Sequence, residues 1–144
     1  MTIRDILRGK GGEVVTIGPG APVVEAMRTL VRHDIGALVV TERGAVRGIL
    51  SERDVLRAGA VDVARLSAGH VRDLMTPDVV VAEPSAGIRE VMDVMTERRI
   101  RHLPVVENGV LCGLVSIGDV VNALRQVTED EVHYLQAYIT GTPL

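Results

Sequence analysis

Apolar residues along this chain fall into short continuous runs, which alternate with stretches where they recur every three or four positions. The runs at residues 14–17, 35–40 and 46–50 predict buried β-strands. The helical spacing predicts helices over residues 22–33 and 51–58. This part of the chain therefore has the order β-α-β-β-α, and its last two strands are expected to form a hairpin.

The same order returns 65 residues later. Residues 19–58 and 84–123 share 14 identities in 40 positions, more than ordinary composition gives by chance. The identities include three pairs at a strand-to-helix turn: Gly48/Gly113, Ser51/Ser116 and Asp54/Asp119. Residues 71–75 also echo residues 3–7, and residues 79–81 echo the first strand. We interpret the chain as an internal duplication.

One copy has too little core to stand comfortably alone. We therefore predict an α/β (α+β) fold in which two β-α-β-β-α repeats pack sheet to sheet about a pseudo-twofold axis. The predicted boundaries are 1–61 for the first repeat with a short N-terminal helix, 62–70 for a linker, 71–125 for the second repeat and 126–144 for a C-terminal helical tail.

The C-terminal tail has no counterpart in the first repeat. Thr128 and Glu131 frame a capping box, which predicts that a new helix begins there. Val132, Leu135 and Ile139 then form an apolar stripe at helical spacing. Helices with such a stripe pack on their own domain or on a partner subunit.

Composition narrows the classes of function. The 144 residues are 47% hydrophobic but only 1% aromatic, so the core is aliphatic and a base-stacking platform for nucleic acid is not expected. A net charge of −3 also argues against a polyanion-binding surface. One cysteine and four scattered histidines offer neither a disulfide nor a metal motif. No apolar run approaches 18 residues, and we expect a cytoplasmic protein without a membrane partner.

The duplication resembles the CBS-domain family, which is named for cystathionine β-synthase. Each copy ends in Gly-h-x-Ser-x-x-Asp, where h is apolar; residues 100–106 read Ile-Arg-His-Leu-Pro-Val-Val and residues 73–77 read Asp-Leu-Met-Thr-Pro. The resemblance implies a tandem CBS pair that binds adenosine-containing ligands in clefts between the repeats. Such ligands include AMP, ADP, ATP, NAD(H) and S-adenosylmethionine. It also implies a regulatory rather than enzymatic protein and a homodimer in the form of a flat disc.

The repeated turn is the predicted ribose site. Asp54 and Asp119 stand in the first turn of a helix, where a carboxylate can accept both ribose hydroxyls. Ser51 and Ser116 stand at the helix N-cap, where free amides favour an anion. The alternative is that Ser-x-x-Asp is only a capping box.

Three basic residues are predicted to contact ligand phosphate: Arg53, Arg101 and His102. Arg53 aligns with Gly118, and its charge is mildly unfavourable in a first helical turn unless an anion is bound there. The alternative is that Glu52 and Asp54 screen the charge, or that it forms a surface pair of little energy. The resemblance implies the phosphate role of Arg101 and His102, although a histidine beside a proline is also common at plain surfaces. Gly36 and Ala37 replace these two in the first repeat, so we expect unequal sites.

The adenine ring is expected to meet backbone groups of the first strands and aliphatic side chains. The predicted adenine-binding residues are Val15, Thr16, Ala37, Leu38, Ile49, Val80, Val81, Leu103, Pro104, Leu114 and Ile117. The alternative is that most of these are core residues only.

The leading prediction is a sensor of AMP, ADP or ATP that needs no metal and signals in trans to an unknown effector protein. A sensor of NAD(H) or S-adenosylmethionine is the nearest alternative. A dimerisation unit without ligand and a nucleotide-hydrolysing enzyme are alternatives of other classes.

Overall fold

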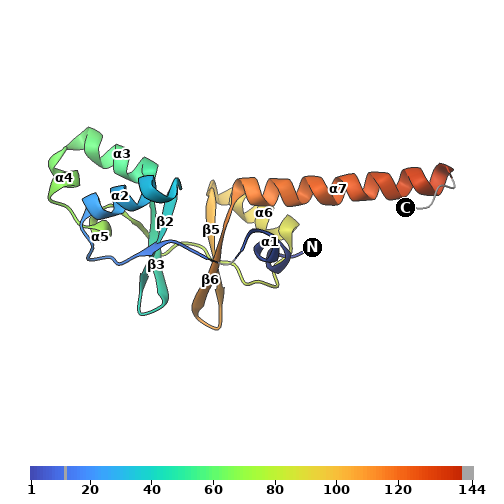
Figure 1. Ribbon diagram of the computed structural model, residues 1–144, viewed down its shortest axis with the longest axis horizontal. Helices are drawn as coiled ribbons and strands as arrows, with labels where there is room; N and C mark the ends of the chain where they lie inside the picture. The colour runs from blue at the N-terminus through green and yellow to red at the C-terminus, as the bar shows by residue number, and fades with distance from the viewer. Residues whose placement is uncertain (12, 141–144) are drawn as a thin grey trace.

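The computed structural model describes residues 1–11 and 13–140. These residues form seven helices and two sheets, arranged as two lobes that meet at their hairpins (Figure 1). In chain order the elements are α1 (Ile3–Lys10), β1 (Thr16–Ile17), α2 (Val23–His33), β2 (Ala37–Glu42), β3 (Ala45–Ser51), α3 (Glu52–Val61), α4 (Ala64–Ser67), α5 (Val71–Leu74), β4 (Thr76–Pro77), α6 (Ile88–Arg98), β5 (His102–Glu107), β6 (Val110–Ser116) and α7 (Ile117–Thr140). The predicted α/β class with two related β-α-β-β-α repeats is confirmed.

Each repeat contributes one antiparallel hairpin, β2–β3 and β5–β6, with equivalent registers. Tight turns close both hairpins, because Arg43-Gly44 and Asn108-Gly109 all have φ between 53° and 80°. We call the first lobe the part with β1–β4 and α2–α5, and the second lobe the part with β5, β6, α1, α6 and α7. Their hydrophobic cores are separate clusters, one around Leu38 and one around Leu103.

Each lobe completes its core with the segment that leads into the other repeat. Ile3 of α1 is fully buried in the second core, and its amide donates to the carbonyl of Ala86 at 3.0 Å. Val71 of α5 is fully buried in the first core, and its amide donates to the carbonyl of Ala21 at 2.9 Å. The strand β4, which follows α5, extends the first sheet by pairing with β3. The two repeats therefore exchange their leading segments.

The crossing of these segments explains why β3 and β6 each contain a glycine at the equivalent position. A Cβ atom on Gly48 would lie 2.5 Å from the carbonyl oxygen of Thr76, and one on Gly113 would lie 2.6 Å from the side chain of Leu7. Both glycines are buried. They are therefore required where the leading segment of the other repeat passes over the strand.

Residues 79–81 do not form the predicted strand. Val39 donates its amide to the carbonyl of Val15 at 3.4 Å and so extends the pairing of β1 with β2. The equivalent of Val39 is Pro104, which has no N–H to donate. Only an isolated parallel bridge between Ala82 and Val105 remains in the second repeat.

The predicted helix start at Thr128 is also wrong, because α7 runs without interruption from Ile117 to Thr140. The Thr128 hydroxyl donates to the carbonyl of Leu124 at 3.0 Å, a bond available inside a helix, instead of capping a new one. The remainder of the predicted tail, residues 141–144, lies outside the described residues. Within the described part of the chain, no helix is both long and apolar enough to cross a membrane.

The two crossing glycines provide a matched pair for a stability test. Gly48→Ala places a methyl group against backbone, which cannot move away, and is expected to lower the free energy of unfolding by about 2–3 kcal/mol. Gly113→Ala meets the flexible end of Leu7 and is expected to cost about 1 kcal/mol. Urea unfolding followed by circular dichroism measures both. An unchanged free energy of unfolding in both variants would contradict the close approach of the leading segments to these strands.

Candidate functional site

The first strand-to-helix turn is closed by a reciprocal pair of hydrogen bonds. The amide of Ser51 donates to Oδ2 of Asp54 at 2.9 Å, and the amide of Asp54 donates to the hydroxyl oxygen of Ser51 at 3.2 Å. This is a capping box, so capping accounts for the spacing of the two residues. Oδ1 of Asp54 accepts no hydrogen bond from the described residues and stays available to an external donor.

The second turn repeats this geometry closely. The amide of Ser116 donates to Oδ2 of Asp119 at 2.8 Å, and the amide of Asp119 donates to the hydroxyl oxygen of Ser116 at 3.1 Å. Ser116 and Asp119 are both half-buried, as are Ser51 and Asp54. Each carboxylate is therefore held in place by its own turn while part of it still faces outward.

The first turn of each helix is also hydrogen-bonded to the residue that precedes the first strand of its hairpin. In α3 the first helical amide, that of Glu52, donates to the carbonyl of Gly36 at 2.9 Å. In α7 the equivalent amide of Ile117 donates to the carbonyl of Arg101 at 2.8 Å. The next amide, of Arg53 or Gly118, has no acceptor among the described residues. Each turn thus combines a fixed carboxylate with one free backbone donor, and Figure 1 shows both helices leaving the same edge of the paired hairpins.

Lys10 distinguishes the second turn from the first. Its Nζ atom lies 2.6 Å from Oδ2 of Asp119 and donates to the carbonyl of Leu114 at 3.0 Å. Burial acts to raise the pKa of Asp119, but the hydrogen bonds from Lys10 and Ser116 outweigh it and hold that pKa below the ordinary value. A ligand that uses this carboxylate must share it with an ammonium group.

His102 occupies the same neighbourhood. It pairs directly with Ser116 across the β5–β6 hairpin, so the two residues are neighbours in the sheet. Burial lowers the pKa of His102, the positive charges of Lys10 and Arg101 lower it further, and Asp119 and Glu52 partly oppose them. The lowered pKa favours the neutral imidazole, which offers a ligand a hydrogen bond.

Glu52 shows that the second site also borders the first repeat. It influences the pKa of His102, although it belongs to α3. Its carboxylate also lies beside Gly36, where a Cβ atom would be 3.5 Å from Oε1. The neighbouring Arg53 is exposed, with no ion pair within the described chain. The predicted phosphate role of Arg53 stays a prediction.

The predicted adenine-binding residues divide according to the alternation of side chains along the strands. Leu38 and Leu103 point into the two lobe cores and are almost fully buried there. Ala37, Ile49 and Pro104 are buried on the opposite strand faces, between the hairpins. A ligand between the lobes could meet the second group but not the side chains of Leu38 and Leu103.

The remaining predicted adenine-binding residues are more accessible. Val15, Val80, Leu114 and Ile117 are half-buried, and Thr16 and Val81 are exposed. Val80, Val81 and Leu103 line one pocket of about 390 Å³ beside α6. That pocket contains none of the predicted ribose or phosphate residues.

Cys112 has the environment of a structural thiol. Burial raises its pKa, Glu107 raises it further, and Arg4 partly opposes them. The protonated thiol donates to the carbonyl of Val105 at 3.4 Å. Across residues 1–11 and 13–140 there is no cluster of three His, Cys, Asp or Glu residues that could hold a metal ion.

Lys10 is the site residue that sequence reasoning missed. It contacts residues more than 100 positions away, and it reaches them only because α1 packs on the second lobe. The offset of 68 that relates residues 3–7 to residues 71–75 pairs Lys10 with Asp78, an acid. Extending that comparison by a few residues would have revealed the charge difference but not the contact.

Comparison with known proteins places this geometry in a family. A family model described as CBS domain matches residues 3–61 and 71–126. The CBS domain-containing protein CBSX3, mitochondrial, of Arabidopsis thaliana is 36% identical over 149 residues, covering 97% of this chain and 72% of the relative.

Solved structures show the same architecture. The CBS-domain containing protein ATU1752 from Agrobacterium tumefaciens aligns with a TM-score of 0.80 and 44% identity, covering 85% of this chain and 98% of that one. CBSX2 in complex with AMP aligns with a TM-score of 0.72 and 29% identity, covering 88% of this chain and 98% of that one.

The contact between Lys10 and Asp119 predicts a measurable titration. Lys10→Gln is expected to raise the pKa of Asp119, because a donor and a positive charge are lost. A carboxyl whose pKa is lowered on folding stabilises the fold above its ordinary pKa, and this contribution disappears as the pH falls through the folded-state value. The stability gap between wild type and variant should therefore close in acid. NMR titration of the Asp119 carboxyl measures the shift, with Lys10→Arg as the charge-preserving control; an unchanged pKa in Lys10→Gln would contradict the contact.

Proposed function

This chain belongs to the CBS-domain family, and we propose that it is a regulatory module that binds an adenosine-containing ligand between its two repeats. AMP, ADP and ATP are the leading ligands, ahead of NAD(H) and S-adenosylmethionine. The module acts as a homodimer and signals in trans to an effector protein. The AMP complex of CBSX2, a relative with the same fold, supports this choice of ligand class.

The observation that carries the proposal is the free oxygen on each turn carboxylate. Asp54 and Asp119 each use Oδ2 for the N-cap amide, and in both the described residues leave Oδ1 without a donor. A ribose carries two adjacent hydroxyl donors, which suit a fixed, half-buried carboxylate. The free amide of Arg53 or Gly118 lies beside it, where the helix N-terminus favours an anion.

The two sites are proposed to differ in charge. Lys10, Arg101 and neutral His102 surround the second turn, and they equip it for a ligand phosphate. Arg53 contacts the phosphate of a ligand bound at the first turn, or of a ligand bound where the two repeats meet. Lys10 holds Oδ2 of Asp119, so a ribose bound at the free Oδ1 would share this carboxylate with the ammonium group and leave a positive charge beside the ligand.

An enzymatic role is less well supported than a sensing role. The thiol of Cys112 is held protonated and donates to backbone, which is the opposite of an activated nucleophile. A dimerisation unit without ligand is the remaining alternative, and the first experiment below distinguishes it.

Asp54→Asn and Asp119→Asn are each expected to lower AMP affinity about tenfold or more, because a neutral amide accepts the ribose hydroxyls less well. The control is Asp73→Asn, since Asp73 caps α5 through the amide of His70 at 3.0 Å in the same way. All three variants lose similar capping energy, but only Asp54→Asn and Asp119→Asn should lose affinity for AMP. Isothermal titration calorimetry measures the affinities. Equal affinities in all variants, or no AMP binding by wild type, would contradict a ribose role.

Arg53→Ala is expected to weaken AMP binding several-fold and to leave adenosine binding unchanged, because only AMP carries a phosphate. Arg57→Ala, one helical turn further along α3, is the matched control for the loss of a surface charge. The same calorimetry compares the two ligands. Equal losses for AMP and adenosine would remove Arg53 from the phosphate site.

A further inference from the structure

The C-terminal half of α7 presents an apolar surface that the described chain does not cover. Packing against the second core reaches Val127, and an ion pair of 3.5 Å between Arg89 and Glu131 then ties α6 to α7. We call residues 132–139 the α7 tail. Leu135, Tyr138 and Ile139 in it are between 56% and 80% exposed. Figure 1 shows this end of α7 projecting away from both lobes.

A projecting helix of this kind needs a surface to pack on. Helices derive most of their stability from tertiary packing of an apolar face, and short unsupported segments are marginal in water. Val132, Leu135 and Ile139 are spaced to share one face, and Tyr134 and Tyr138 lie one turn apart. The α7 tail thus has the pattern of a helix that docks in a groove.

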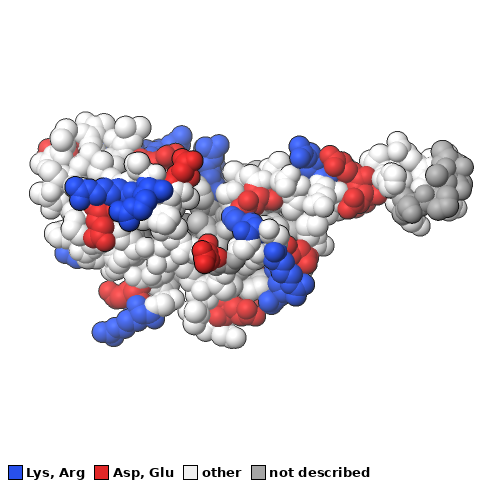
Figure 2. Space-filling model, in the orientation of Figure 1, with Lys and Arg blue, Asp and Glu red and all other residues white. Residues whose placement is uncertain are grey.

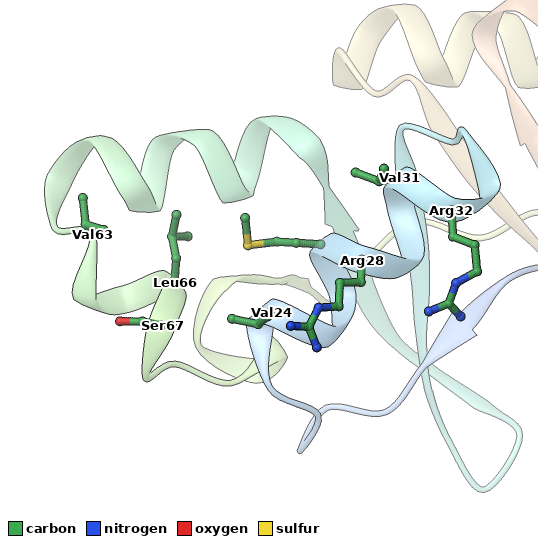
Figure 3. A pocket seen from close by; sticks show the side chains of 8 residues that line it. Val24, Arg28, Val31, Arg32, Val63, Leu66 and Ser67 are labelled. Atoms are coloured by element: carbon green, nitrogen blue, oxygen red, sulfur yellow. The ribbon is translucent and has the colours of Figure 1, made fainter.

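The first lobe offers such a groove between α2 and α4, with a volume of about 550 Å³. Figure 3 shows Val24 and Arg28 of α2 beside Leu66 of α4. Met27, Val31 and Val63 complete its apolar lining, and the two valines are 81% and 71% exposed. We call this the α2–α4 groove.

Charge complements the apolar match. Arg28 and Arg32 belong to the lining of the α2–α4 groove, and no acidic residue does. Glu129, Asp130 and Glu131 directly precede the α7 tail, and the tail itself has no Asp, Glu, Lys or Arg. Glu129 pairs with Arg125 and Glu131 with Arg89, so Asp130 is the acid of this band with no ion pair among the described residues. Figure 2 shows this acidic band on α7 followed by an uncharged surface. An acidic band before an apolar helix fits a groove with two arginines.

The groove and the tail of one chain lie at opposite ends of the molecule (Figure 1), so a chain cannot fill its own groove. We propose that the α7 tail docks in the α2–α4 groove of a second copy, and that two copies exchange their tails reciprocally. This requires an antiparallel pair in which each second lobe lies beside the partner's first lobe. Reciprocal contacts close the assembly and leave neither surface open for a third copy.

This inference rests on the dimer of the proposed function and not on its ligand. Leu135→Glu in the tail and Val31→Glu in the groove should each weaken the dimer about tenfold or more, because each places a charge in an apolar contact. Val110→Glu, at an exposed position of the β5–β6 hairpin, is the matched control and should leave the dimer unchanged. Sedimentation equilibrium of the full chain measures dissociation, and circular dichroism verifies folding.

A charge exchange tests the pairing itself. Arg32→Glu should weaken the dimer, and adding Asp130→Arg in the same chain should restore it. In a Cys112→Ser background, a Val31→Cys chain mixed with an Ile139→Cys chain should form a mixed disulfide. A monomeric wild type, a dimer insensitive to either Leu135→Glu or Val31→Glu, or a disulfide only between two Val31→Cys chains would each overturn the proposal.

AMP titrations of the same variants separate this inference from ligand binding. None of these substitutions lies in the turns of Asp54 or Asp119, so AMP affinity should match wild type in all of them. A protein that dimerises as proposed but binds no AMP would refute the ligand and leave the exchange of tails intact. A monomer that binds AMP would do the reverse.

Discussion

The two hydrophobic cores of this protein depend on each other, because each is completed by the segment that leads into the other repeat. Ile3 fills the second core and Val71 fills the first, and both side chains are fully buried. Gly48 and Gly113 allow the crossing segments to approach the strands. Unfolding one lobe would therefore remove a buried residue from the other, which makes the pair a single cooperative unit in spite of its two cores.

The same exchange creates the difference between the two turns. Because α1 packs on the second lobe, its last residue, Lys10, reaches the carboxylate of Asp119. The identical Ser-x-x-Asp turns then carry different electrostatics, with a cation against Asp119 and around His102. A duplication with near-perfect local symmetry thus acquires unequal sites through one long-range contact.

The sequence was sufficient for features with a local signal. The duplication, the two hairpins and the capped turns follow from periodicity, from glycine at tight turns and from the Ser-x-x-Asp spacing. Long-range contacts carry no such signal, so the exchange of leading segments and the position of Lys10 were not predictable from pattern alone. Two local predictions failed for identifiable reasons. Pro104 lacks the N–H that the strand at residues 79–81 needed, and Thr128 lies in mid-helix because nothing in residues 124–131 interrupts α7.

The continuity of α7 has a mechanical consequence. Its first turn holds Asp119, and its 24 residues extend about 36 Å at 1.5 Å per residue. An unbroken helix behaves as a stiff rod over this length, so a tilt of about 5° at its first turn displaces its far end by about 3 Å. A hinge at Thr128 would have absorbed that motion. Because α7 is continuous, a tilt of its first part, which packs in the second core, would move its C-terminal half, which lies outside the two lobes.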